Sequence, residues 1–562
     1  MVNYCVGKNS HIVNANQFVE VGGTVTCRES TQEESHTDTM DLPFNFVAFF
    51  LFLSFLLALI KGLKRSKTAQ KLPPSPWKLP IIGHMHHLMG SPPHHALRKL
   101  AQKYGPLMNI QLGQMTAIVV TSPRLAKEIM KTHDLAFADR AEFLSGKIMC
   151  YDCSDIACCR YGDYWRQMRK ICTLELLSAK SVRSFASVRQ DEALHLIASI
   201  KVLAGAREPI DLTEKVSSYT SSVVCRAAFG KVSKDDHAAF LQLMKEALPI
   251  ASAFDISDLL PSFKILHPLL SVESKLLKMH DKEDEILEKI IDQHIDNQAR
   301  RNISTGEYGQ EDLIDVLLRV KESGELQFPI TKNNIKAVIH DVFGAGTETS
   351  SSIVDWAMSE MIRNPGVMAK AQSEIRNAFR GKNRIEETDI QQLQYLRSVI
   401  KETLRLHPPI PLLIPRECRE ECEIDGYIIP VKTKILVNAW AIGRDPEYWD
   451  DPECFKPERF EESPIDFAGS RFEYLPFGAG RRICPGISFG LANVDVALAL
   501  LLYHFDWKLP NGLDSKDLDM KETVGITASR TNNLRLLATS YDTSFQWFED
   551  SAETGRVVSV SA

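Results

Sequence analysis

The sequence predicts a mainly α-helical fold with a small β portion, and two observations lead to this prediction. Apolar residues recur with a helical period through most of the middle of the chain. Strand-like alternation or β-branched content is confined to the short segments 108–112, 117–120, 423–429 and 435–438. The chain of 562 residues contains no internal linker, repeat or low-complexity tract, so we expect one large globular body.

The first element along the chain is an apolar segment, residues 44–60, interrupted only by Asn45 and Ser54. A helix of this length reaches about 26 Å, just enough to span the hydrocarbon core of a bilayer. Four basic residues follow it, whereas two aspartates precede it, which places everything downstream in the cytoplasm. A cleaved secretory signal would need a basic start and a small-residue cleavage site, and neither is present. A buried core helix is the weaker alternative.

These features divide the chain into five expected parts. They are a polar leader (1–39), a membrane anchor (40–61), a basic and proline-rich hinge (62–80), the globular body (81–543) and a polar tail (544–562). We expect that translation starts at Met40 or that the leader is a gene-model artefact, with a short lumenal tail as the alternative. The tail 544–562 is likewise expected not to be native.

A long central helix is expected over residues 332–364, with Thr331 as its N-cap and Pro365 ending it. Its middle carries two residues with almost no side chain, Ala345 and Gly346, followed by a run of threonines and serines. Hydroxyl side chains compete for backbone hydrogen bonds, so we expect a locally opened helical turn there.

Two side chains of this helix are candidates for proton transfer. The hydroxyl of Thr349 could hold a water molecule, and the carboxylate of Glu348 could relay protons. A cluster of Ser and Thr on a helix is by itself usually a solvated or back-bonded surface.

The strongest chemical signal is the segment 477–486, which places Cys484 in a glycine-punctuated, arginine-flanked loop before an apolar helix. Glycines allow positive φ and close backbone approach, so N–H groups can point at the sulfur. This pattern predicts the axial thiolate of a haem, and such a ligand favours O–O cleavage over electron transfer or oxygen carriage. A structural cysteine is the alternative. A dinucleotide loop fits badly, because Ile483 stands where its third glycine belongs.

Four segments resemble signatures of the cytochrome P450 family, in the family's order. The haem-binding signature is filled at its fixed positions by Phe477, Gly480, Arg482, Cys484 and Gly486. Residues 345–349 resemble the oxygen-binding stretch, residues 402–405 the E-x-x-R helix and residues 457–460 the P-E-R-F segment. The resemblance covers roughly residues 40 to 540 and is nearest to plant microsomal enzymes, in particular the terpenoid-hydroxylating subfamily.

The resemblance implies the cytochrome P450 fold, with haem b (iron protoporphyrin IX) between the central helix and the loop of the metal ligand Cys484. It implies that the haem carboxylates meet Trp165, Arg169, Arg416 and Arg482. It also implies a structural network that fixes the cysteine loop: a glutamate and an arginine on one helix face with an arginine from the P-E-R-F segment, namely Glu402, Arg405 and Arg459.

The substrate site is expected to be apolar, because the recognition positions implied by the resemblance carry few charges. These positions are Cys158, Phe343, Ile410, Leu412, Leu413 and Ile526. Relatives typically have phenylalanine at 158 and proline at 160, so Cys158 and Arg160 predict an enlarged or reshaped pocket. We expect an NADPH- and O2-dependent monooxygenase that hydroxylates a sesquiterpene or diterpene skeleton. The alternatives are a hydroxylase of a phenolic or alkaloid substrate and a haem-thiolate isomerase or dehydratase.

Partners follow from what the chain contains and lacks. No flavin or nicotinamide fingerprint occurs, so electrons must come from a separate NADPH–cytochrome P450 reductase, which we expect to dock near Arg166 and Lys170. The anchor predicts the endoplasmic reticulum membrane. No basic block with interleaved aromatic residues occurs, which argues against nucleic acid as a partner.

Two close cysteine pairs, Cys150/Cys153 and Cys418/Cys422, lack a second Cys/His pair at zinc spacing and are predicted to be unlinked thiols.

Overall fold

The computed structural model describes residues 48–56, 71–230, 233–251, 254–301, 311–324, 326–382, 385–523 and 525–541. Within the predicted anchor, residues 48–56 form a helix whose apolar side chains are almost all exposed. The rest of the anchor, residues 62–70 of the hinge, the leader and the predicted tail 544–562 lie outside the described residues.

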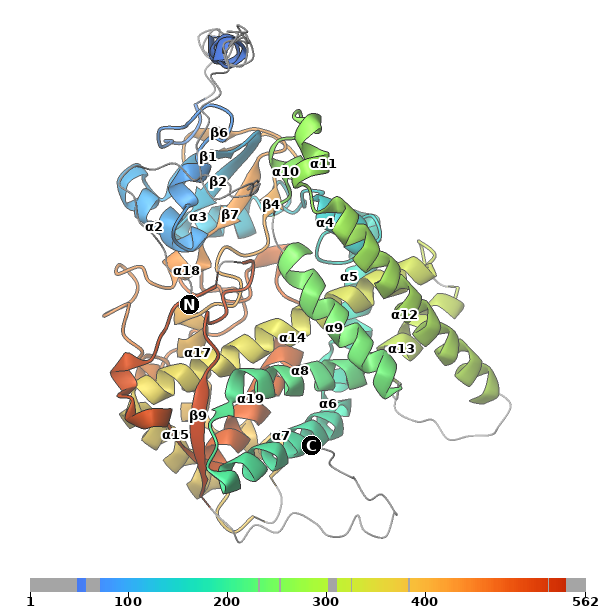
Figure 1. Ribbon diagram of the computed structural model, residues 1–562, viewed down its shortest axis with the longest axis vertical. Helices are drawn as coiled ribbons and strands as arrows, with labels where there is room; N and C mark the ends of the chain where they lie inside the picture. Colours follow the sequence, from blue (N-terminus) through green and yellow to red (C-terminus); the bar gives the residue numbers. More distant parts are fainter. Residues whose placement is uncertain are drawn as a thin grey trace, which may run out of the picture. The chain divides into compact units, whose positions relative to one another are not determined.

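The prediction of a mainly helical fold with a small β portion is confirmed (Figure 1). The α-helices are α2 (Pro93–Tyr104), α3 (Pro123–Lys127), α4 (Leu144–Met149), α5 (Asp163–Ile171), α6 (Ala179–Ser184), α7 (Ala186–Ala206), α8 (Leu212–Phe229), α9 (Lys234–Ala251), α10 (Ile256–Leu259), α11 (His267–Leu270), α12 (Glu273–Arg301), α13 (Leu313–Glu322), α14 (Lys332–Arg363), α15 (Pro365–Ala378), α16 (Glu387–Ile390), α17 (Gln394–Leu406), α18 (Ala439–Ile442) and α19 (Ile487–His504).

The strands form three small sheets. The largest has the order β1-β2-β7-β4, with β1 and β2 antiparallel, β2 and β7 parallel, and β7 and β4 antiparallel. The others have the orders β3-β9-β8 and β5-β6. The strands are β1 (Leu107–Leu112), β2 (Met115–Val120), β3 (Ile210–Asp211), β4 (Arg416–Glu417), β5 (Cys422–Ile424), β6 (Tyr427–Ile429), β7 (Lys434–Val437), β8 (Phe505–Lys508) and β9 (Arg535–Ser540).

One predicted strand is wrong. Residues 423–429 are not a single strand but the hairpin of β5 and β6, which pair antiparallel with Ile424 opposite Tyr427. Asp425 and Gly426 both have positive φ and turn the chain between the two strands. An Asp-Gly pair between two apolar runs is a hairpin signal, which the alternation of the flanking residues obscured.

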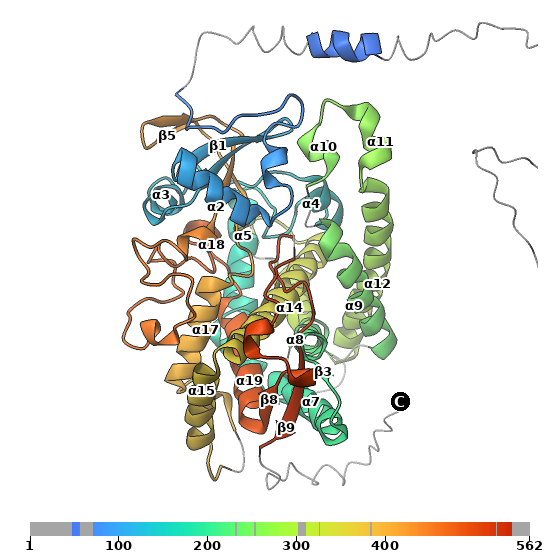
Figure 2. The same ribbon diagram turned by 60° about the vertical axis from the view of Figure 1, so that its left-hand side comes forward.

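Helix α14 runs through the middle of the molecule, and α8, α17 and α19 pack against it (Figures 1 and 2). Thr331 caps it as predicted, because its side chain accepts a hydrogen bond from the backbone N–H of Asn334. The predicted opened turn is wrong, since the helix is continuous through residues 345–352. The hydroxyl of Thr349 donates to the carbonyl of Ala345 at 2.6 Å, so it is satisfied without a break in the helix.

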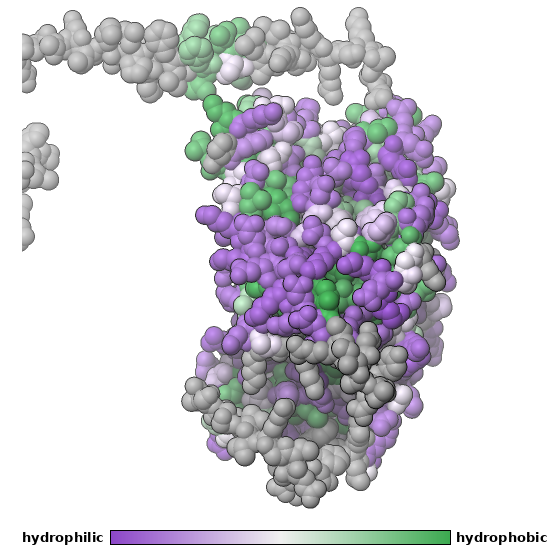
Figure 3. All heavy atoms as spheres, turned by 90° about the vertical axis from the view of Figure 1, so that its right-hand side faces the viewer, coloured by the Kyte–Doolittle hydropathy of each residue, from purple (hydrophilic) through white to green (hydrophobic). Residues whose placement is uncertain are grey.

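Helix α19 is long and apolar enough to cross a membrane, but 67% of it is buried. It packs against α14 and α7 and is a helix of the core. The face that carries α12 is mainly hydrophilic, with apolar residues in separate small groups (Figure 3).

Candidate active site

The loop before α19 folds back on itself around Cys484. The backbone N–H of Cys484 donates to the carbonyl of Phe477 at 3.1 Å, which closes the loop. Gly478 and Gly480 both have φ of +69°. A Cβ at Gly480 would lie 2.1 Å from the carbonyl oxygen of Met130, so at this position the close approach of two backbones requires glycine.

The Cys484 thiol has neighbours that favour its ionised form. Burial raises its pKa, but a hydrogen bond from the backbone N–H of Gly486 and the positive charge of Arg169 act in the opposite direction. Arg169, on α5, also donates to the carbonyl of Ile483 at 2.5 Å. The side chain predicted to meet a haem carboxylate therefore holds the cysteine loop itself.

Helix α14 passes beside this loop and presents an uncovered face. A Cβ on Gly490 of α19 would lie 3.5 Å from the Ser350 hydroxyl of α14, which shows how closely the two helices approach. Ala345 is exposed and Thr349 half-buried, although the helix on either side of them is buried. The face of α14 that carries Ala345 and Thr349 is therefore not covered by side chains of the described residues.

Two residues of α14 that were predicted to line the substrate or haem site, Phe343 and Gly346, pack against neighbouring helices. Phe343 is 1% exposed and its ring contacts that of Phe240, on the face of α14 opposite to Ala345. Its assignment to the substrate pocket stays a prediction. Gly346 faces α8, where a Cβ would lie 3.2 Å from a methyl group of Val224, so its small size serves helix packing.

Glu348 is half-buried, and burial raises the pKa of its carboxyl group, while a hydrogen bond from the Thr527 side chain lowers it. Thr527 belongs to a turn that is tied to the core through the next residue, Ala528. The carbonyl of Ala528 accepts a hydrogen bond from the Trp356 indole at 2.9 Å, and its N–H donates to the carbonyl of Pro409 at 2.8 Å. This contact between the turn and Glu348 has no counterpart in the sequence predictions.

A group of arginines lies on the other side of the cysteine loop. Arg482 donates to the carbonyls of Ala138 and Cys159 at 2.8 and 2.5 Å and lies over the ring of Trp165. Burial lowers the pKa of Arg482 to about 10, with Arg416 adding to the effect.

Arg416 donates to the Asp134 carboxylate at 2.8 Å and to the carbonyl of Ala479 at 2.6 Å. A further arginine, Arg140, was missed by the sequence predictions. Its pKa is also lowered, by burial and by the charges of Arg482 and Arg416. Arg140 directly follows Asp139, a pairing of opposite charges that is common on protein surfaces, so the local sequence gave no signal of its burial.

These residues fit a haem. Three buried guanidinium groups repel one another and have the Asp134 carboxylate as a close charged partner, so they suit a ligand with two carboxylates. The Cys484 thiol would be the ligand of the haem iron. Trp165, whose indole donates to the carbonyl of Ile156 at 3.0 Å, stands between Arg169 and Arg482.

The buried charge network is brought together as the sequence predicts. Glu402 accepts from Arg405 at 2.7 and 2.8 Å and from Arg459 at 3.0 Å. Arg459 lies in the short helix η5 (Pro457–Phe460). Both arginines lie near the Trp449 ring, whose indole donates to the carbonyl of Glu473, just before the cysteine loop.

The remaining pocket candidates are partly buried apolar or thiol side chains. Leu413 lies beside the cysteine loop, because a Cβ on Gly478 would be 3.7 Å from its Cδ1. Leu412 packs on the cluster that includes Leu436, and Ile410, Ile526 and Cys158 are half-buried.

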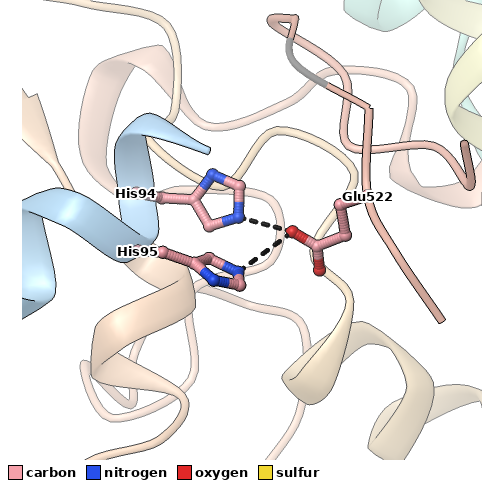
Figure 4. Close-up of side chains that lie close together, drawn as sticks. All are labelled: His94, His95 and Glu522. Carbon is pink, nitrogen blue, oxygen red and sulfur yellow. Dashed lines mark hydrogen bonds and ion pairs between the residues drawn. The ribbon is translucent and has the colours of Figure 1, made fainter. Parts of the chain in front are cut away.

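A second polar cluster holds the segment that leads into the Thr527 turn (Figure 4). His94 and His95, on α2, point their Nε2 atoms at the Glu522 carboxylate, at 2.6 and 3.2 Å. His407, at the end of α17, lies 3.8 Å from the same carboxylate. Although burial opposes it, hydrogen bonds from these histidines hold the pKa of Glu522 well below its ordinary value. We call these four residues the Glu522 cluster.

Comparison with known proteins agrees with this geometry. Residues 73–535 match the family model described as Cytochrome P450. Premnaspirodiene oxygenase of Hyoscyamus muticus is 59% identical over 501 residues, which cover 89% of this chain and 99% of that protein. The 5-epiaristolochene 1,3-dihydroxylase of Nicotiana tabacum is 55% identical, with the same coverage of both chains. A zebra fish cytochrome P450 structure with abiraterone has a TM-score of 0.67 at 24% identity, covering 80% of this chain and 99% of that one.

Proposed function

The chain belongs to the cytochrome P450 family, and on that premise we propose that it is an NADPH- and O2-dependent monooxygenase that hydroxylates a terpenoid. Its substrate is a sesquiterpene or diterpene skeleton. The observation that carries the proposal is the closed Cys484 loop, which Arg169 holds through the carbonyl of Ile483 and which has buried arginines beside it.

A haem bound here through a thiolate activates dioxygen, so that one oxygen atom enters a C–H bond of the substrate. Cys484 would hold the iron, and Trp165, Arg169, Arg416 and Arg482 would face the haem carboxylates. The Glu402 network keeps the cysteine loop in place.

Proton supply falls to Glu348 and Thr349. The raised pKa of Glu348 brings this carboxyl group closer to neutral pH, which suits a group that both accepts and donates protons. The hydrogen bond from Thr527 orients the carboxyl group. The Thr349 hydroxyl, on the accessible face of α14, is placed to hold a water molecule.

The substrate is bound through apolar contact. Ile410, Leu412, Leu413 and Ile526 offer no charged group, so the site selects shape and apolar area. Burial of such a skeleton gains roughly 25 cal/mol per Å². Relatives named for the oxidation of premnaspirodiene and 5-epiaristolochene support a terpenoid substrate.

Electrons come from a separate NADPH–cytochrome P450 reductase. Arg166 and Lys170 are exposed on α5, the helix whose buried side carries Trp165. A positive surface over this helix suits an acidic electron donor and places it near the cysteine loop.

The catalytic domain lies at the cytoplasmic face of the endoplasmic reticulum membrane. Exposed apolar side chains gather on two of its segments: Ile265, Leu269 and Leu270 at α11, and Trp77 and Ile81 near the end of β1. Figures 1 and 2 show α11 and β1 at the same end of the catalytic domain. A surface of this kind suits contact with lipid, and the apolar segment 44–60 supplies the anchor.

The test reconstitutes the enzyme with a reductase and feeds it terpene hydrocarbons, flavonoids and indole alkaloids, with products read by mass spectrometry. We expect a thiolate-type spectrum of the reduced carbon monoxide complex and mono-oxygenated terpenes that form only with NADPH. Turnover confined to aromatic compounds would overturn the terpenoid substrate. Product formation without NADPH would overturn the monooxygenase and favour an isomerase or dehydratase.

A further inference from the structure

The loop between α4 and α5 gathers thiols and a carboxylate outside the haem site. Four of its residues are cysteines, at positions 150, 153, 158 and 159. The sulfurs of Cys150 and Cys158 and a carboxylate oxygen of Asp155 all lie within 4.8 Å of one another. Cys153 is close by, since a Cβ on Gly146 would lie 3.2 Å from its sulfur and 3.4 Å from that of Cys158. The sequence prediction of unlinked thiols considered Cys150 and Cys153 alone and did not include Asp155 or Cys158.

Asp155 is the member of this cluster that lacks a full set of partners. It is 0% exposed, and its Oδ2 accepts a hydrogen bond from the backbone N–H of Cys158 at 2.9 Å. Its Oδ1 is buried and accepts no hydrogen bond from an N–H or hydroxyl group among the described residues. A buried carboxylate oxygen in this state is costly unless a proton or a cation meets it.

The neighbouring carboxylate, that of Asp341 on α14, shares a hydrogen bond with Asp155, which requires a proton between the two groups. The Oδ2 of Asp341 also accepts hydrogen bonds from the N–H groups of Ile156 and Ala157, at 2.8 and 3.1 Å. These bonds tie the loop to α14 and leave two carboxylates side by side, which is an arrangement that a cation stabilises.

We propose that Cys150, Cys158 and Asp155 bind a zinc ion, with Cys153 within reach as a fourth ligand. Thiolate sulfur and carboxylate oxygen are ligands that zinc accepts in tetrahedral sites. Binding releases the thiol protons, and two thiolates with one carboxylate leave the zinc site with a single negative charge. The buried guanidinium of Arg140 balances that charge, because its Nε donates to the carbonyl of Ala157 within the same loop.

The backbone holds the ligands in place before metal arrives. The N–H groups of Cys150 and Cys153 both donate to the carbonyl of Gly146, at 3.1 and 3.2 Å. Tyr151, Asp152 and Cys153 all have positive φ, a conformation that is unfavourable for residues other than glycine. Zinc would offset this cost and would fix the segment that carries Cys158, at the wall of the predicted pocket.

The Glu522 cluster is a weaker candidate for a metal. There the carboxylate already accepts hydrogen bonds from two histidines, at 2.6 and 3.2 Å, and has a third at 3.8 Å. The ring N–H groups of the histidines thus balance the charge of Glu522, whereas Asp155 has a second carboxyl group as its side-chain neighbour.

The experiment uses the full-length holoenzyme, incubated with zinc chloride, dialysed, and analysed for zinc and iron by mass spectrometry. We expect about one zinc per chain, with zinc–sulfur scattering at about 2.3 Å in X-ray absorption. The double variant Cys150→Ala/Cys158→Ala should lose at least about nine-tenths of the zinc, since its thiolates are gone. Cys225→Ala, at a buried cysteine of α8, is the matched control and should keep it.

Asp155→Asn is a second variant that keeps the shape of the side chain and should lower zinc affinity at least tenfold. Iron content and the carbon monoxide spectrum report whether each variant is folded. Wild-type enzyme without zinc, zinc retained in the double variant, or a Cys150–Cys158 disulfide in the intact protein would each overturn the proposal. If the double variant does not fold, the wild-type absorption spectrum and Asp155→Asn decide the question.

Discussion

The Glu402 carboxylate accepts hydrogen bonds from two nitrogens of the Arg405 guanidinium, at 2.7 and 2.8 Å, where neither side chain is exposed. Arg405 also donates to the carbonyls of Gly443 and Pro452. The pair therefore joins α17 to two loops that lie before the cysteine loop.

Glu402→Gln should lower the yield of haem-loaded enzyme severely. It leaves the Arg405 charge buried without its counter-ion, which typically costs about 3–5 kcal/mol. The measurement is carbon monoxide-binding enzyme per mole of purified chain. Glu461→Gln is the control, because Glu461 pairs with Lys370 on the exposed surface and should change stability by less than about 1 kcal/mol. Equal yields for the two variants would contradict the role of the network.

Gly480→Ala should disrupt the cysteine loop far more than Gly478→Ala. Both glycines have φ of +69°, so both substitutions carry the same backbone cost of about 1–2 kcal/mol. At Gly480 the new methyl group would also meet the carbonyl oxygen of Met130 at 2.1 Å, whereas at Gly478 the nearest atom is 3.7 Å away. Thermal unfolding and the carbon monoxide spectrum measure the difference. If the two variants behaved alike, the close approach at Met130 would not matter.

Cys484→Ala should abolish the thiolate-type carbon monoxide spectrum and all turnover. The reason is that Cys484 alone lies in the loop that resembles the haem-binding signature. Cys454→Ala, at an exposed cysteine, should change neither property. A thiolate spectrum that survived in the Cys484 variant would refute the assignment of the ligand.

Thr349→Ala should leave haem binding unchanged and divert electrons from product to hydrogen peroxide. The hydroxyl lies on the accessible face of α14, and its loss removes a site for the water that delivers protons. We expect at least a severalfold rise in peroxide per NADPH. Ser351→Ala is the control: it removes a hydroxyl on the same helix that donates to the Glu348 carbonyl, and this variant should form no more peroxide per NADPH than the wild type does. Equal coupling in both variants would exclude a special role of Thr349.

Stability should fall at alkaline pH because of His340. Its Nδ1 lies 2.7 Å from the Glu283 carboxylate, and this charge raises the pKa of His340 from 6.5 to about 9, against the opposing effect of burial. A pKa raised on folding gives stability that is complete below pH 6.5 and lost as pH rises through about 9. Asp341 and Asp155 act in the same direction as Glu283.

The measurement compares the unfolding temperature of wild type and His340→Gln from pH 6 to 10. The difference between them should be largest near pH 6 and shrink above pH 9. A difference that stayed constant across this range would contradict the ionised pair.

The sequence predicted those features that depend on residues close together in the chain. Thr331 caps α14 because its hydroxyl needs nothing beyond Asn334, three residues away. Cys484 and the glycines around it form a compact motif whose geometry depends on the loop itself. The E-x-x-R spacing likewise brought Glu402 and Arg405 onto one face of one helix.

The features that were not predicted depend mostly on contacts between segments far apart in the sequence. The contact of Phe343 with Phe240 was not predicted, because α14 is buried on most sides and only tertiary packing decides which apolar face meets which helix. Arg140 binds carbonyls of residues far along the chain, including Ile414, so no local pattern predicts its place. The turn at Asp425 was missed because the flanking alternation looked continuous.

The Glu522 cluster has a consequence for synthesis of the enzyme. His94 and Glu522 are separated by 428 residues, and His407 joins them from a third region of the chain. Contacts between such distant residues give a high contact order, which slows folding, and in this case a nascent chain cannot form them until translation is almost finished. Until then the two histidines at the start of α2 lack their carboxylate, and the Thr527 turn is not docked against α14. The growing polypeptide is therefore expected to depend on chaperones, and to be open to proteolysis, until its final segment leaves the ribosome.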